Sequence, residues 1–195
     1  MSTVASSSAS PSKRAASLPP KERRAAIIEA VRPLLVEYGE TVTTKQIACA
    51  AGIAEGTIFR VFADKDELLD ATLEAALDQE QFEAALRSID PDQSFEDQLI
   101  EATVLIQRRV VDVWTLLSHV SAKRHEQVRR PMTDSPALAD LFTAHPDRIR
   151  VEPVLAARLL RALTMSLTHP MIAAEAAEAA EIVDTVLHGI GSIPA

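Results

Sequence analysis

The sequence has few of the residues that sheets and disulfide-bonded folds require. Aromatic residues make up 4% of its 195 residues and glycines number five, while alanine and leucine dominate an apolar content of 47%. Such a composition favours helices. No run of alternating β-branched residues lies between hairpin turns. The sequence therefore predicts an all-α protein.

Signals for export and for membranes are also missing. The only cysteine, Cys49, excludes an internal disulfide and favours a reducing compartment. No segment approaches the roughly 18 consecutive apolar residues of a membrane span. The N-terminus lacks the apolar core of a signal peptide. We expect a cytoplasmic protein.

Patterns typical of enzymes and metal sites are likewise absent. The five histidines have no metal-binding spacing, and one cysteine cannot complete a zinc site. The chain has no G-x-S-x-G, P-loop or G-x-G-x-x-G motif. We expect no enzyme activity, no cofactor and no metal.

Charge is divided unequally along the chain, whose overall net charge is −8. Residues 1–66 carry nine Lys and Arg against seven Asp and Glu, a net of +2, and residues 67–195 carry eleven against twenty-one, a net of −10. A basic head on an acidic body indicates different partners. We predict a Ser- and Ala-rich disordered arm at 1–20, a first domain at 21–66 and a second at 67–195.

The first domain begins with an amphipathic helix. Apolar residues recur with helical spacing over 21–38, and the stripe continues in phase beyond Pro33. Gly39 suits the end of this helix.

Two shorter helices follow. Thr43 and Gln46 form a capping box that opens a second helix, which runs to about Ala50. Gly52 provides a turn before a third helix over 55–62. This is a helix-turn-helix arrangement, which offers its second helix to the major groove of DNA.

Side chains that face away from the small core of this unit are the candidate DNA contacts. Arg60 has a fork that matches guanine O6 and N7, and Gly56 lets the backbone approach closely. Thr44 and Lys45 lie at a helix start that attracts phosphate. Glu55 either accepts from cytosine N4 or complements its helix N-terminus. The full candidate set is Thr43, Thr44, Lys45, Glu55, Gly56, Thr57, Phe59, Arg60 and Lys65.

Four motifs follow one another in this region: T-x-x-x-I-A at 43–48, A-A-G-I at 50–53, G-T-I-F-R-x-F at 56–62 and D-K-x-E-L-L at 64–69. Together they resemble the TetR family of bacterial transcriptional regulators. The resemblance implies a three-helix DNA-binding domain with a helix-turn-helix, followed by a helical ligand-binding and dimerisation domain.

The same resemblance implies a homodimer on a palindromic operator of double-stranded DNA. It also implies a repressor that a small-molecule effector releases; the alternative is a constitutive DNA-binding regulator without effector control. Three positions depart from the family pattern: Phe59 replaces the usual Tyr, Val61 the usual His, and Ala54 the usual Ser cap.

The second domain is predicted to be a series of helices. Asp64 with Glu67 opens the first, and Ser94 caps a long one. The remaining predicted segments are a short helix at 78–89, a loop or frayed end at 123–134, a short helix from Ser135-Pro136, a helix from Pro153 to His169, and a last helix at about 175–188.

Two surfaces of this domain are candidates for binding. Apolar side chains, with Arg108 or His119 as a polar anchor, are candidates for an effector pocket. They are Arg108, Trp114, Leu117, His119, Val120, Leu141, Phe142 and Met165. The helix from Pro153 is small or apolar nearly all round, and the last helix has one apolar stripe opposite a glutamate side. A second copy of the chain is expected to cover one side of this surface; the alternative is that both helices are central in a monomer core. The candidate dimer contacts are Leu155, Leu159, Ala162, Ser166, Ala176, Ala180, Val183 and Leu187.

Overall fold

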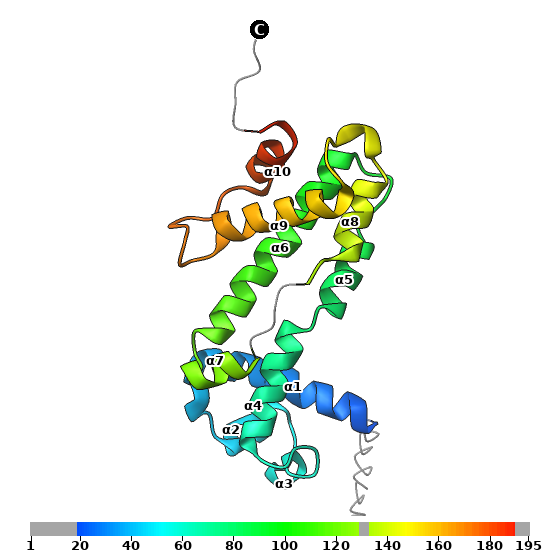
Figure 1. The fold of residues 1–195 in the computed structure, drawn as a ribbon. Coiled ribbons are helices and arrows are strands. Elements are labelled where there is room, and N and C mark those ends of the chain that lie inside the picture. Colours follow the sequence, from blue (N-terminus) through cyan, green and yellow to red (C-terminus); the bar gives the residue numbers. More distant parts are fainter. Residues whose placement is uncertain (1–18, 129–132, 190–195) are drawn as a thin grey trace, which may run out of the picture.

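A computed structural model describes residues 19–128 and 133–189, and every element within them is helical (Figure 1). The all-α prediction is thereby confirmed, while the predicted arm lies outside the described residues up to position 18. The elements are α1 (Pro20–Tyr38), η1 (Gly39–Thr41), α2 (Thr44–Ala50), α3 (Glu55–Ile58), α4 (Lys65–Leu77), α5 (Glu80–Arg87), α6 (Phe95–Leu117), α7 (Ala122–Val128), α8 (Pro136–Thr143), η2 (Pro146–Arg148), α9 (Pro153–Thr168) and α10 (Ala179–His188).

We call residues 20–66 the head and residues 67–189 the body. Figure 1 shows α1, α2 and α3 at one end of the molecule and α9 and α10 toward the other, with the long α6 running between them. No helix in the described ranges is both long and apolar enough to cross a membrane.

The head is built on α1. Its buried side chains recur with helical spacing, as predicted, and the helix continues through the exposed Pro33. Gly39 follows the last helical residue with φ of 58°, a left-handed value that glycine adopts without strain. The buried stripe consists of Ile27, Ile28, Val31 and Leu35.

The core of the head continues past the predicted domain boundary at residue 66. Leu68, Leu69 and Leu73 of α4 are buried in the same cluster as the head side chains, and so are Leu116 and Val128 of the body. The helix that joins head to body is therefore part of the hydrophobic core of the head. A rotation of α4 would disturb that core.

A second core lies in the body among α5, α6, α8, α9 and α10. Phe95 and Phe142 meet edge to face with ring centroids 5.9 Å apart, which is a favourable geometry for aromatic pairs. Leu99, Leu138 and Leu160 are fully buried beside them. These contacts fix the body as a separate packed layer beyond the head.

Three element boundaries differ from the predictions. Residues 122–128 form α7 rather than a loop, because Val128 and Arg124 are buried against the head. The part of that predicted loop at 129–132 lies outside the described residues. The third helix ends at Ile58, and a tighter turn follows in which the Arg60 N–H donates to the Thr57 carbonyl at 3.3 Å.

The last helix begins at Ala179, not near residue 175. The Ala177 N–H donates to the Leu167 carbonyl of α9 at 3.0 Å. This bond holds the preceding segment against α9 and keeps it out of the helix. Ala176 therefore lacks the helical phase with Ala180 that the sequence pattern predicts.

Candidate DNA-binding surface

The helix-turn-helix is formed by local capping and by a small buried core. Thr43 and Gln46 make both bonds of the predicted capping box, with the Thr43 N–H donating to the Gln46 side chain at 2.8 Å. Gly52 takes φ of 64° in the turn. Ile47 and Ile58 are fully buried where the two helices meet. The angle between α2 and α3 is thus set by packing.

One side of α3 and its following turn is exposed. Ile58 and Phe62 point into the core, so the residues on the opposite side face outward. Phe59 exposes 50% of its surface, and Arg60 is exposed beside it. In Figure 1 α3 lies at the extreme end of the molecule, away from the body. A long partner such as a DNA duplex can contact this side of α3 without contacting the body.

Gly56 lies in the middle of that exposed side. Its φ is not left-handed, and a Cβ added at this position would meet nothing within 4 Å. Neither backbone strain nor internal packing therefore requires a glycine, although glycine weakens a helix relative to alanine by up to about 1 kcal/mol. The missing side chain leaves room for an external molecule to approach the backbone.

The cations of the head fall into two groups. Lys45 and Arg60 are exposed, and within the described residues no hydrogen bond or ion pair engages them. Lys65 is half-buried, and its Nζ donates to the carbonyls of Glu40 at 2.9 Å and Val42 at 3.2 Å. Lys65 thus holds the connection between α1 and α2, and we remove it from the candidate phosphate contacts.

The polar side chains at the helix starts are also engaged. The Thr43 hydroxyl is used in the cap, and the Thr44 hydroxyl donates to the Glu55 carboxylate across the turn. That bond joins α2 to α3, a role for Glu55 that the sequence did not indicate. Thr57 is half-buried. Among the exposed candidate contacts, the side chains that engage no other described residue are Lys45, Phe59 and Arg60.

The candidate effector-pocket residues are distributed over three places. Phe142 is buried in the body core with Leu141 packed against that core, whereas Leu117 and Val120 pack against the head cluster. Trp114 belongs to neither cluster of described residues, and its ring centroid lies 4.6 Å from that of His169. The structure therefore does not gather these side chains around one cavity.

The other pocket candidates lie near the surface. His119 is exposed, with its Nδ1 2.6 Å from the Thr115 carbonyl oxygen. Arg108 is exposed, and Met165 is half-buried on α9. Arg108 and His119, the two predicted polar anchors, therefore lie on the surface and not inside a pocket.

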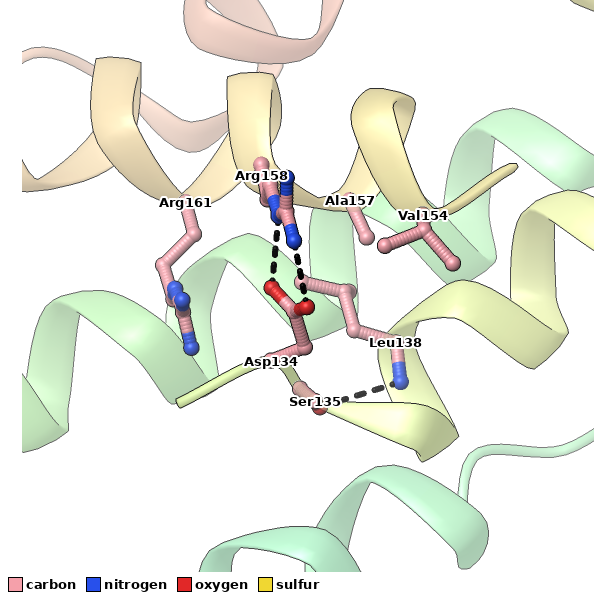
Figure 2. Close-up of a pocket in the computed structure, with 7 residues that line it drawn as sticks. All are labelled: Asp134, Ser135, Leu138, Val154, Ala157, Arg158 and Arg161. Carbon is pink, nitrogen blue, oxygen red and sulfur yellow. Dashed lines mark hydrogen bonds and ion pairs between the residues drawn. The ribbon is translucent and has the colours of Figure 1, made fainter. Parts of the chain in front are cut away.

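A shallow depression with no room for a water molecule lies between α8 and α9. Figure 2 shows Asp134 spanning it to meet Arg158, whose Nε and Nη2 donate to the two carboxylate oxygens at 2.7 and 2.6 Å. The hydrogen bonds from Arg158 hold the pKa of Asp134 below its usual range. The lining residues are Asp134, Ser135, Leu138, Val154, Ala157, Arg158 and Arg161, none of which belongs to the predicted pocket.

The candidate dimer residues are mostly exposed. Leu155 and Leu159 expose 44% and 50% of their surfaces on α9, and Ala162 and Ser166 are exposed on the same helix. Val183 is an exception, because only 2% of it is exposed and it packs in the body core. Val183 is thus wrong as a dimer contact.

The candidates on and before α10 are less uniform. Ala180 is exposed on the helix, and Leu187 is half-buried against the body core. Ala176 is exposed in the segment before the helix.

Among the described residues no group of three or more His, Cys, Asp or Glu is placed to hold a metal ion.

Comparison with known proteins agrees with this geometry. Residues 27–72 match the family model described as bacterial regulatory proteins, tetR family. That range begins within α1, includes the whole helix-turn-helix and ends within α4.

Solved structures extend the similarity to the whole fold. A TetR/AcrR-family transcriptional regulator from Thermobifida fusca is 23% identical with a TM-score of 0.57, covering 88% of this chain and 100% of its own. The regulator FadR from Bacillus subtilis, in complex with stearoyl-CoA, is 15% identical with a TM-score of 0.57, covering 86% and 99%. The regulator LfrR from Mycobacterium smegmatis, in complex with proflavine, is 19% identical with a TM-score of 0.51, covering 88% and 99%.

The fold and the exposed α3 of the head define a DNA-binding transcriptional regulator of the helix-turn-helix class. The match over the head and the shared fold of the whole chain confirm the resemblance that the four sequence motifs carry. Residues 27–72 are thus those of a TetR-family DNA-binding domain, and the whole chain has the fold of TetR-family regulators.

Proposed function

We propose that this protein is a homodimeric repressor that binds a palindromic operator through α3 and leaves it when a small molecule binds the body. The observation that carries the DNA contact is Gly56, a helical glycine that neither the backbone nor the packing requires. A DNA backbone or base edge fills the space that a side chain would occupy.

Around Gly56 we assign three roles. Arg60 reads a base edge, because its unpaired guanidinium can donate twice to guanine. Lys45 neutralises a phosphate, which contributes affinity independent of sequence. Phe59 contributes apolar contact, since it has no hydroxyl to donate to phosphate.

Dimerisation is assigned to the exposed face of α9. Leu155 and Leu159 form an apolar patch that α9 shares with Ala162, whose small side chain permits close approach of two helices. When the two-fold axis through this face runs along the length of the molecule, the two heads lie on the same side of the dimer. Each α3 then meets one half of a symmetric operator.

Release by an effector follows if the effector binds one arrangement of the two heads better than the other. The relative FadR, which has this fold, is seen with stearoyl-CoA. A repressor of this fold can therefore be expected to admit a small molecule into its body.

A regulator without effector control is the second candidate. It is favoured by the distribution of the pocket candidates, which divides Phe142 in the body core from Val120 against the head. Thermal-shift screening of fractionated metabolites separates the two. Under effector control one fraction raises the melting temperature and releases the operator, whereas a constitutive regulator keeps its operator in every fraction.

Substitution of Arg60 tests the DNA contact. Arg60→Ala should cost about 1–3 kcal/mol of specific binding and relax the preference at one operator position. Lys45→Ala is the matched control: it should weaken binding to all sequences similarly and lower the salt dependence by about one phosphate. If Arg60→Ala leaves both affinity and preference unchanged, α3 is not the recognition helix.

A further inference from the structure

The turn and short helix after α6 rest directly on the head. Val128 of α7 is buried in the head core, and Figure 1 shows α7 beside the head at the lower end of α6. A Cβ added at Gly39 would lie 3.0 Å from the carbonyl oxygen of His119. The backbone between α1 and α2 is thus packed directly against the backbone of the turn between α6 and α7.

Arg124 of α7 is the charged centre of this contact. Its Nη2 donates to Asp66 at 2.7 Å and its Nη1 donates to Asp70, both on α4. Its Nε lies 3.4 Å from the Glu40 carboxylate without making a hydrogen bond. One buried guanidinium therefore faces three carboxylates from two separate elements, η1 and α4.

A second bond fixes the same carboxylate. The Ser121 N–H donates to Glu40 Oε1 at 2.7 Å, and this bond holds the pKa of Glu40 below its usual range. Glu40 is thus held both by the turn before α7 and by Arg124 within α7.

A buried cation adds little net stability over an apolar residue, because it loses its hydration. The best-attested role of such a buried charge is to select one arrangement of the packed elements, because its partners can pair with it in only one geometry. The planar fork of Arg124 meets Asp66 and Asp70 only when α4 has one rotation relative to α7. Removing the guanidinium leaves three carboxylates that repel one another across the same junction.

We propose that Arg124 is a positioning residue that fixes the angle between head and body and so sets the half-site spacing that the dimer accepts. This inference rests on the proposed homodimer. Two heads held at fixed angles match operators of one spacing only. Changing the spacing by one base pair rotates one half-site by about 35°, because B-DNA turns once in about 10–10.5 base pairs.

The test measures affinity for three operators, the selected one and versions with one central base pair added or removed. The wild-type protein should bind both altered operators at least about tenfold more weakly than the selected one, because rigid heads must distort the DNA. The Arg124→Gln variant should discriminate among the three by less than about threefold. Arg124→Lys keeps a cation without the fork and should restore part of the discrimination.

Arg148→Gln is the matched control, because Arg148 pairs with Glu96 at 2.6 Å at the opposite end of α6. It should keep the wild-type pattern. Where Arg124→Gln does not fold, Asp70→Asn removes one partner of the guanidinium and should relax the spacing in the same direction.

Three outcomes overturn the inference. A folded Arg124→Gln protein with the wild-type spacing pattern would do so, and so would an equal loss of affinity at all three spacings. The latter would mean that Arg124 only stabilises the fold. A wild-type protein that binds no two-fold operator would contradict the proposed function itself, and this inference with it.

Discussion

The outward faces of α3 and α9 expose side chains of opposite kinds. On and beside α3 these are Lys45 and Arg60, which have no partner within the described residues, and a glycine with free space around it. On α9 they are Leu155 and Leu159, each about half exposed. Contacts among the residues that the structure describes explain neither set.

This contrast indicates that the α3 surface and the α9 surface bind different kinds of partner. Unpaired cations cost little in water and become favourable beside phosphate. Exposed leucines are unfavourable in water and become favourable against another apolar face. The net charges of +2 for residues 1–66 and −10 for residues 67–195 fit the same division.

The largest expected effect comes from placing a charge on the apolar face. Leu159→Glu should convert the dimer to a monomer and lower operator affinity by at least about a hundredfold, because an unpaired charge in an interface costs several kcal/mol. Sedimentation and operator titration measure the two effects.

Val36→Glu provides the control for this substitution. Val36 is 37% exposed on α1, so it has comparable exposure away from α9. This variant should remain a dimer. A Leu159→Glu protein that also remains dimeric would remove α9 from the interface.

The second-largest effect is expected on the α3 surface, where one substitution should change the stability of the fold and the affinity for DNA in opposite directions. Gly56→Ala should raise the free energy of unfolding by up to about 1 kcal/mol, since alanine favours the helix and the space is open. The melting temperature should rise by about 2–4 °C. Operator affinity should fall at least about tenfold, because the methyl group occupies the space that DNA needs.

Calorimetry and operator titration on the same samples check this pair of changes. A variant that is more stable and binds DNA as well as the wild type would show that Gly56 does not face the operator.

The smallest effect concerns the junction between the two ends. The Ser121 N–H and Arg124 keep the pKa of Glu40 below its ordinary value of 4.5. A depressed carboxyl pKa means that ionised Glu40 stabilises the fold above about pH 4.5. That contribution is lost as the pH falls through the lower pKa of the folded state.

Urea titrations at several pH values measure this dependence. The wild-type protein should lose more stability than Glu40→Gln between about pH 5 and pH 3, a range that includes the ordinary carboxyl pKa. The variant has no carboxylate to protonate at this position. Identical slopes for the two proteins would show that Glu40 is not held in its charged form by the junction.

The sequence was informative wherever structure follows from local chemistry. The capping box of Thr43, the serine caps at Ser94 and Ser135, and the terminal Gly39 all begin or end helices where predicted. Each depends on residues within one helical turn of the boundary. The helix-turn-helix and its exposed Arg60 were therefore accessible to sequence reasoning.

Long-range contacts were not accessible in this way. Residues 123–134 look polar in sequence, and only the distant carboxylates of Glu40, Asp66 and Asp70 explain why Arg124 is buried in a helix. Lys65 was expected on phosphate, but its partners are carbonyls in another element. Periodicity could not assign Val183 to the chain's own core, because a stripe facing that core and one facing a second copy have the same spacing.

Selection of bound sequences from random duplex DNA by the purified protein, at a stated salt concentration, tests the central assignment most directly. The α3 surface on a two-fold dimer predicts enrichment of an inverted repeat whose half-sites lie about 10–10.5 base pairs apart, or a multiple of that distance. Recovery of no enriched sequence, or of one without two-fold symmetry, would contradict it.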